Sequence, residues 1–329
     1  MPHPKRPTQR DENPFPYSDS HKRYYTYDYW LRKTFGGKCA KIPLDAGFTC
    51  PNIDGRCGHG GCIYCSPRGS GDFAESASLP LWEQYERGVA TLSKKWTVER
   101  CIPYLQAHTN TYAPAERLRR LYAEILTFPH VVGMNIATRA DCLPPDTVAC
   151  LAEVAELTTL TVELGLQTAH EATASRINRG HTYADFVEGY TRLRAASPRI
   201  QTCIHLIFGL PGETEEDMLA TVRAVAKLHP HQVKIHLLHV LRHTALGAMY
   251  ERGEYEPMER ERYIDTVVRA LELLPADTVI ARLTGDGAAA DLLAPAWSRA
   301  KMAVLNDVDR ALYLRKTFQG NEYKQYIEL

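Results

Sequence analysis

The chain has 329 residues, of which 44% are hydrophobic and 24% charged, and its 39 basic and 39 acidic residues leave no net charge. This is the composition of a globular protein with a large core, and it excludes the basic field typical of proteins that bind nucleic acid by charge alone. No apolar run approaches the ~20 residues of a membrane-spanning helix, and nine cysteines without an export signal favour a reducing cytoplasm.

Two segments precede the main body of the chain. Residues 1–23 are polar and rich in proline, so we expect a flexible N-terminal arm and not a signal peptide. Residues 24–35 are strongly aromatic. We favour a helix whose rings pack inward, the alternative being a surface for a planar partner.

Four cysteines then lie within sixteen residues: Cys50, Cys57, Cys62 and Cys65. Four glycines between Cys50 and Cys62 let the backbone wrap around something small. Thiolates at this spacing are typical of metal sites, and spacing alone leaves two interpretations open. Four thiolates can close a structural zinc site, whereas three can hold an iron–sulfur cluster with one iron free for a further ligand. Tyr64 would shield the edge of such a cluster.

Apolar, strand-like runs alternate with helical patterns over the rest of the chain. We expect strands at 38–46, 101–107, 131–138, 157–167, 200–210 and 232–240, and helices at 79–96, 113–128, 144–157, 183–196 and 214–228. Thr214 and Asp217 have the spacing of a capping box at the start of the last helix. Apolar strands alternating with helices predict an α/β fold with a parallel sheet, and six such units suit a partial (β/α)6 barrel.

This pattern predicts a barrel over residues 24–250, with a cluster loop at 47–66, and a C-terminal extension over 251–329 that covers the barrel mouth. In parallel α/β folds, chemistry gathers at the carboxyl ends of the strands. Polar residues do fall at the ends of the predicted strands, so one rim of the barrel is expected to be polar and to meet the cysteine loop.

Motifs along the chain support a family resemblance. Cys50, Cys62 and Cys65 have the spacing C-x11-C-x2-C within GFTCPN and GGCIYC, and QAHTNTYAP, TRADCLP, VELGLQTAH, INRGHT, HLIFGLPGET and VKIHLLHVLRHTAL follow in order. With these motifs the chain resembles a radical S-adenosylmethionine (SAM) enzyme, and more closely the YhcC-type family, which is related to the catalytic subunit of Elongator.

The resemblance implies a [4Fe–4S] cluster held by Cys50, Cys62 and Cys65, with SAM on the fourth iron. An electron, supplied by a flavodoxin- or ferredoxin-like donor, then cleaves the sulfonium to a 5′-deoxyadenosyl radical that abstracts hydrogen from a C–H bond. Cys57 departs from the family pattern, and we expect it to be a loop thiol and not a fourth ligand. The remaining cysteines, at 39, 101, 142, 150 and 203, are expected in the core.

By analogy, the polar rim supplies the SAM site and the substrate site. The expected SAM-binding residues are Tyr64, Gln106, Thr109, Asn110, Thr138, Glu163, Gln167, Arg179 and Gly209. Of these, Arg179 is a candidate for the methionyl carboxylate, and Glu163, Gln167 and Thr138 for the ribose. Arg139 and Asp141 either pair with each other or contact the cofactor. The weaker substrate candidates are His205, His236, Arg242 and Asp286.

Three functions stay open. The first is a cytoplasmic radical enzyme that modifies tRNA at the C5 side chain of a wobble uridine, as the Elongator resemblance suggests. The second is a radical enzyme acting on a small metabolite or a tetrapyrrole, and the third is a zinc-stabilised binding protein without catalysis. A basic cluster, Arg117, Arg119 and Arg120, is either a phosphate contact or a solvated helix face, and the zero net charge argues against strong unaided RNA binding.

Overall fold

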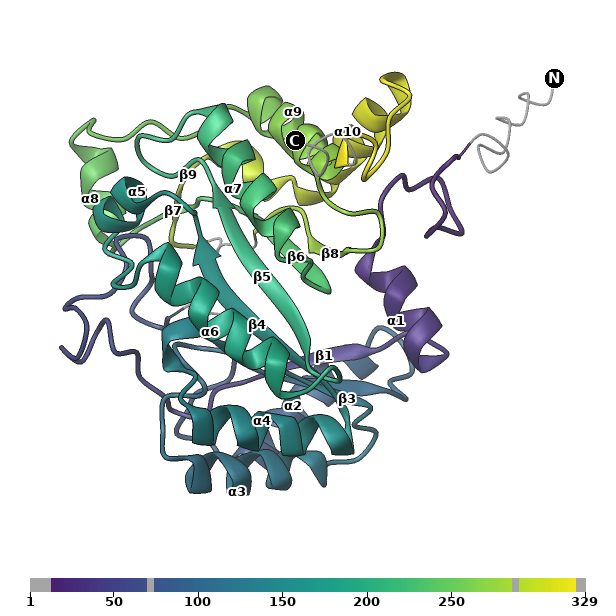
Figure 1. Cartoon of the computed structure of the whole chain (residues 1–329), viewed down its shortest axis with the longest axis vertical. Coiled ribbons are helices and arrows are strands. Elements are labelled where there is room, and N and C mark those ends of the chain that lie inside the picture. The colour runs from purple at the N-terminus through teal and green to yellow at the C-terminus, as the bar shows by residue number, and fades with distance from the viewer. Residues whose placement is uncertain (1–12, 70–73, 286–289, 324–329) are drawn as a thin grey trace.

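The computed structural model describes residues 13–69, 74–285 and 290–323. Its centre is a sheet of seven parallel strands in the order β1-β2-β3-β4-β5-β6-β8 (Figure 1). The strands are β1 (Ala40–Leu44), β2 (Cys101–Leu105), β3 (Gly133–Thr138), β4 (Thr159–Gln167), β5 (Gln201–Phe208), β6 (Gln232–Leu237) and β8 (Val279–Arg282). The first six are those predicted from the sequence, and the partial α/β barrel is confirmed.

The seventh strand was not predicted. β8 has only four residues, and it pairs with β6 through Gln232–Val279 and Val233–Ile280, across more than forty residues of chain. So short a run carries no recognisable period of its own. The extension that we placed over the barrel mouth therefore also contributes a strand to the sheet edge, and the boundary at residue 250 stays a prediction.

Helices follow the strands and cover the outer face of the sheet (Figure 1). The five predicted helices are present as α2 (Leu81–Ser93), α3 (Ala115–Leu126), α4 (Pro145–Leu157), α6 (Tyr183–Ala196) and α7 (Glu215–Lys227). Thr214 and Asp217 form the expected capping box on α7, and Thr182 with Asp185 forms a second on α6. The other helices are α5 (Glu171–Arg176), α8 (Ala245–Glu251), α9 (Arg260–Leu273) and α10 (Lys301–Leu314).

Short elements complete the carboxyl-terminal side. Strands β7 (Val240–Leu241) and β9 (Leu292–Ala294) form an antiparallel ribbon, and the 3-10 helices η2 (Ala140–Cys142) and η3 (Ala296–Arg299) follow β3 and β9. Among the described residues, no helix is both long and apolar enough to cross a membrane.

The N-terminal aromatic segment packs against the body. It forms α1 (Tyr27–Phe35), in which Trp30 and Leu31 are buried, so its rings pack inward as we favoured. The part of the arm that is described also has partners: Lys22 pairs with Asp309 of α10. Residues 1–12 lie outside the described residues.

Alternation along the strands decides what faces the barrel interior. In β1, Ile42 and Leu44 are fully buried in the core, whereas Lys41 and Pro43, which alternate with them, line an interior cavity. Successive side chains of a strand point to opposite faces, so the apolar residues pack under the helices while the polar ones turn inward. The functional site is therefore built from the inner face and the carboxyl ends of the strands.

Candidate functional site

The cysteine loop follows β1 at the carboxyl end of the sheet. Cys50, Cys62 and Cys65 are half-buried, whereas Cys57 is exposed. Within the described residues, no three of these thiols lie within 4.8 Å of one another. Tetrahedral zinc with Zn–S bonds of about 2.3 Å would hold the sulfurs about 3.8 Å apart. An iron–sulfur cluster would hold its thiolate ligands further apart than a single zinc ion does, because the irons of the cluster lie between them.

Cys57 has a different surrounding from the other three. Its Sγ lies 3.6 Å from Nη2 of Arg139. That guanidinium is held by Asp141 through two bonds of 2.9 and 2.8 Å, and it donates to the Arg179 carbonyl at 2.8 Å. Of the two alternatives for Arg139 and Asp141, the structure shows the mutual pair.

Two asparagines bind the cysteine loop to the turn after α5. The fully buried Asn52 donates from Nδ2 to the Asn178 carbonyl at 2.5 Å. In return, Nδ2 of Asn178 donates to the carbonyls of His59 and Gly61 at 3.0 and 2.7 Å. A Cβ at Gly58 would lie 2.0 Å from Oδ1 of Asn52, so a larger residue there would displace the Asn52 amide. The loop and the turn therefore form one structural unit.

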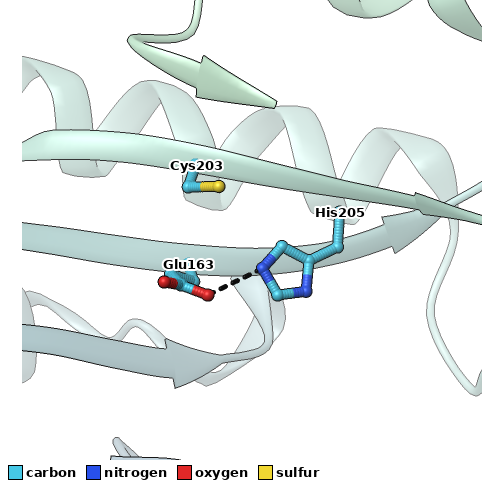
Figure 2. A group of neighbouring side chains, drawn as sticks. All are labelled: Glu163, Cys203 and His205. Atoms are coloured by element: carbon cyan, nitrogen blue, oxygen red, sulfur yellow. Dashed lines mark hydrogen bonds and ion pairs between the residues drawn. The ribbon is translucent and has the colours of Figure 1, made fainter. Parts of the chain in front are cut away.

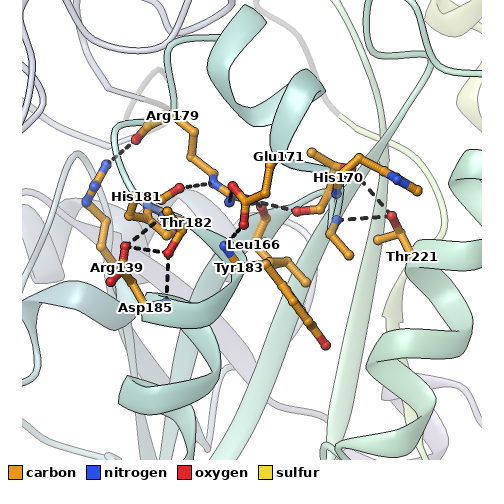
Figure 3. A network of polar contacts seen from close by, with 12 residues as sticks. Arg139, Leu166, His170, Glu171, Arg179, His181, Thr182, Tyr183, Asp185 and Thr221 are labelled. Atoms are coloured by element: carbon orange, nitrogen blue, oxygen red, sulfur yellow. Dashed lines mark hydrogen bonds and ion pairs between the residues drawn. The ribbon is translucent and has the colours of Figure 1, made fainter.

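Arg179 lies in a buried polar network and not in an open anion site (Figure 3). Its Nη1 donates to the carbonyls of Leu166 and Thr168 at 2.7 and 2.5 Å, and its Nε donates to that of His181 at 3.0 Å. Only 1% of the residue is exposed. These bonds hold the end of β4 against the following turn, whereas Nη2 of Arg179 is buried without a hydrogen-bond partner among the described residues. The role of Arg179 toward the methionyl carboxylate stays a prediction.

A cavity of about 600 Å³ lies inside the barrel next to the cysteine loop. Five of the predicted SAM or substrate residues line it, and each comes from a different segment of the chain: Tyr64, Gln106, Gln167, His205 and His236. Gln167 has a positive φ of 70°, at an irregularity in the pairing of β4 with β5. The polar rim that we predicted beside the cysteine loop therefore corresponds to a cavity in the structure.

Three predicted residues lie behind the cavity wall. Asn110 is fully buried and donates to the carbonyls of Ala107 and Ala137, both at 3.0 Å. The hydroxyl of Thr138 is bonded to that of Thr111 at 2.5 Å. Thr109 is also buried, and its backbone N–H donates to the Thr49 carbonyl at 3.2 Å. These side chains shape the wall and join it to the start of the cysteine loop.

The remaining rim candidates are dispersed. Gly209 lines a second cavity, where its carbonyl accepts from the Tyr255 hydroxyl at 2.7 Å. Arg242 is exposed and does not line the barrel cavity. Asp286 lies outside the described residues. In the described part of the chain, neither Gly209 nor Arg242 is among the residues that line the barrel cavity.

The floor of the cavity is formed by Lys41, His205 and Lys234, which line it, and Glu163 lies behind them with its acceptor positions filled by protein groups. Its Oε1 accepts from Lys41 at 2.6 Å and from Asn135 at 2.7 Å, and its Oε2 accepts from His205 at 2.9 Å and from Lys234. The carboxylate is completely buried. Because its acceptor positions are filled, Glu163 does not fit the predicted role of binding the ribose.

Charge explains the ionisation of this group. Burial alone would raise the pKa of the Glu163 carboxyl, but Lys234, Lys41 and His205 hold it well below its usual range. Burial, reinforced by Lys234, lowers the pKa of His205 to about 4. Glu163 is therefore a carboxylate and His205 a neutral imidazole at neutral pH.

Glu163, Cys203 and His205 also lie close enough together to suggest a metal site (Figure 2). Two observations argue against a metal there. The Glu163 oxygens already pair with two ammonium groups. In addition, burial and the Glu163 carboxylate raise the pKa of Cys203 to about 12, so its sulfur stays protonated. Of the three residues, His205 lines the cavity, and Glu163 and Cys203 lie behind it.

Sequence reasoning missed several cavity residues. Lys41, Tyr104 and Arg282 line the cavity together with Tyr27 and the half-buried Cys39, which we had placed in the core. The other cysteines predicted to be in the core (101, 142, 150 and 203) are buried. A signal for Lys41 was present, because a lysine within a short, otherwise apolar strand requires a buried partner. Only the fold shows that the partner is Glu163.

Comparison with known proteins identifies the family. Residues 52–225 match the model of the radical SAM superfamily, and residues 230–314 match that of the radical SAM C-terminal domain. The fold is similar to that of Elp3 from Methanocaldococcus infernus with an N-terminal deletion, with a TM-score of 0.65 and 17% identity, over 87% of this chain and 67% of that one.

Relatives cover almost the whole chain. YtqA of Bacillus subtilis (strain 168), an uncharacterized protein, is 45% identical over 316 residues, 96% of this chain and 98% of YtqA. YhcC of Escherichia coli (strain K12) is 32% identical over 283 residues, 86% of this chain and 90% of YhcC. A tRNA uridine(34) acetyltransferase of Methanocaldococcus jannaschii is 26% identical over 196 residues, 58% of this chain and 34% of that protein. The chain therefore belongs to the radical SAM superfamily, as an enzyme of the group that contains YtqA and YhcC, and its cofactors are a [4Fe–4S] cluster and SAM.

Proposed function

We propose that this enzyme modifies tRNA at the C5 side chain of a wobble uridine. The observation that carries the proposal is the similarity, over 58% of the chain, to a protein whose name assigns it to uridine 34 of tRNA. C–H bonds on such a side chain are not acidic enough for ordinary base catalysis. A radical route is therefore chemically appropriate for this target.

The cysteine loop and the cavity suggest how the cofactors would be held. Cys50, Cys62 and Cys65 would bind the cluster, and SAM would lie between the loop and the cavity, within reach of Tyr64, Gln106 and Gln167. Once bound, these cofactors supply the 5′-deoxyadenosyl radical that abstracts hydrogen. The protein itself positions the substrate carbon and keeps water away from it.

The cavity suits a single extruded base. Unstacked bases of an anticodon loop are easily moved out of the loop, and pockets that bind flipped bases read them through hydrogen bonds. His205 and His236 line the cavity on adjacent strands, with ring centres 5.3 Å apart. Nε2 of His236 is buried and has no hydrogen-bond partner among the described residues, so it would be available to the base. Gly209, Arg242 and Asp286 have no place in this proposal.

The basic cluster on α3 does not support a phosphate contact. Arg119 pairs with Glu153 at 2.8 Å, Arg120 lies 3.9 Å from Glu116, and Arg117 stacks over Phe48. RNA binding would therefore depend on the cavity and its surroundings and not on this helix. A tRNA substrate would place the enzyme in the cytoplasm, where a flavodoxin- or ferredoxin-like protein would supply electrons to the cluster.

Nucleoside analysis of tRNA tests the proposal. The gene is deleted, and the strain is complemented with the wild-type protein or with Cys62→Ala, which removes a proposed cluster ligand. In the deletion strain and the Cys62→Ala strain, mass spectrometry of digested tRNA should show loss of one modified uridine and accumulation of its precursor. Wild type should restore the profile. An unchanged nucleoside profile under several growth conditions would reject tRNA as the substrate.

A further inference from the structure

The floor of the cavity holds two lysines but only one carboxylate. Glu163 accepts from Lys41 at 2.6 Å and also from Lys234, and Asn135 and His205 occupy its remaining acceptor positions. One carboxylate balances one ammonium. The group therefore carries one positive charge in excess whenever both lysines are protonated.

The two lysines are not equivalent. The side chain of Lys234 is 7% exposed and that of Lys41 is 26% exposed, and both line the cavity. Loss of the Lys41 proton leaves Glu163 and Lys234 as a neutral pair, so no buried charge is left without a partner. Lys41 is also the more accessible of the two to a molecule in the cavity. It can therefore change its protonation state where a substrate would meet it.

We propose that Lys41 is the group that exchanges a proton with the substrate, while Lys234 is the permanent counter-ion of Glu163. In the exchange, the proton moves between Nζ of Lys41 and a nitrogen or oxygen atom of the bound substrate, and water restores the original state of the amine. This proposal rests on the proposed function, because the same cavity would receive the base, and it assigns Lys41 a role there.

The surroundings of Lys41 support this assignment. Burial lowers the pKa of the Lys41 ammonium to about 7, with Glu163 opposing the shift and Lys234 reinforcing it. Its Nζ also lies 3.7 Å from the centre of the Tyr104 ring. The titratable and charged groups around it, from all the packed elements, are Tyr27 (α1), Tyr104 (β2), Glu163 (β4), Cys203 and His205 (β5), Lys234 and His236 (β6), and Arg282 (β8).

Most of these neighbours keep one protonation state near neutrality. Burial raises the pKa of the Tyr27 and Tyr104 hydroxyls and lowers that of His236 well below its usual range. The pKa of Cys203, at about 12, and that of His205, at about 4, also lie several units from neutrality. Among the groups around the cavity whose pKa is shifted, Lys41 is the one with a value near 7. A group in that range is suited to both acid and base catalysis at physiological pH.

Competitive labelling of lysines tests the proposal directly. The full-length, cluster-loaded protein is treated with trace acetic anhydride at a series of pH values, and acetylation of each lysine is measured by mass spectrometry. Lys41 should label with a midpoint of about 7. Lys227, which is exposed on α7, serves as the reference in the same samples. A Lys41 profile that runs parallel to that of Lys227, or the absence of Lys41 labelling at every pH, would overturn the proposal.

A variant at Lys234 supplies the second measurement. Lys234→Met leaves Lys41 and Glu163 as a one-to-one pair and removes a repelling charge from Lys41. The midpoint of Lys41 labelling should therefore move to higher pH. An unmoved midpoint in a variant that still loads iron would show that the two lysines do not share the carboxylate as proposed.

Complementation separates proton exchange from simple charge. Lys41→Arg keeps the positive charge but cannot exchange a proton near neutrality, so it should be as defective as Lys41→Met. Both should reduce formation of the modified nucleoside at least about tenfold. Full rescue by Lys41→Arg would leave Lys41 only an electrostatic role. If instead tRNA is unchanged in the deletion strain, the tRNA function is rejected. The labelling of Lys41 does not involve tRNA, so it still tests the proton exchange at Lys41 independently.

Discussion

At the scale of single residues, Cys57 is the thiol whose role the loop leaves most open. It lies in the same loop as the three proposed ligands, but it is exposed and its sulfur faces the Arg139 guanidinium at 3.6 Å. A fourth thiolate on the cluster would occupy the iron that SAM needs. We therefore predict that Cys57 lies outside the ligand set.

We expect Cys57→Ala to bind as much iron and sulfide as the wild type after anaerobic reconstitution. Cys62→Ala, the matched change at a proposed ligand, should lose most of both, because two thiolates do not hold the cluster firmly. Iron and sulfide counts on the two purified variants check this. Equal losses in Cys57→Ala and Cys62→Ala would make Cys57 a ligand.

At the scale of elements, the turn after α5 holds the cysteine loop in place. Asn178 adopts a positive φ of 52° and directs its amide to two loop carbonyls, while its own carbonyl accepts from Asn52. Ile63 adds a backbone bond to the Ile177 carbonyl at 3.1 Å. A loop held from outside at several points can keep its thiols in position before the cluster is inserted.

Removal of the Asn178 amide should speed the loss of iron. Asn178→Gly tolerates the positive φ but lacks the amide, so we expect it to release iron to a chelator several-fold faster than the wild type. Thr182→Ala is the control, since it removes the α6 cap at a cost of about 1 kcal/mol and contacts none of the loop carbonyls. If Asn178→Gly retains iron as well as Thr182→Ala does, the amide does not hold the loop.

At the scale of the whole molecule, buried neutral histidines determine the response to acid. Burial lowers the pKa of His205 and of His231 to about 4 and that of His181 to about 3. In the unfolded chain each would titrate near ~6.5. As the pH falls from ~6.5 to ~4, the unfolded state takes up protons that the folded state does not, so stability decreases over this window.

The melting temperature should therefore decrease as the pH is lowered from ~6.5 to ~4, with each histidine contributing at most about 1.4 kcal/mol per pH unit. Nδ1 of His231 accepts from the Thr202 N–H at 3.0 Å, so His231→Gln should reduce the slope by removing one of the buried neutral histidines. His243→Asn, at an exposed turn with a φ of 63°, is the control and should leave the slope as it is. A slope that is the same in His231→Gln as in the wild type would contradict this account.

The sequence by itself determined most of the strands and helices and located the cysteine loop, because these are local properties. Six strands, five helices and the Thr214 capping box were readable from the apolar period and the cap spacing, which depend on neighbouring residues. The spacing of Cys50, Cys62 and Cys65 likewise lies within one loop. The four residues of β8 were missed because a strand so short is defined by its pairing with β6.

Only the tertiary structure decided what these residues do in the interior. Lys41 lies 122 residues from Glu163 along the chain, and Lys234 lies 71 residues from it, yet both share its carboxylate. The same fold turned Glu163 away from its expected cofactor role, because protein partners fill its hydrogen bonds. Such pairings depend on which strands lie side by side and which face each residue takes. Periodicity along a single strand therefore predicts that a polar residue faces the barrel interior, but only the folded sheet determines its partner.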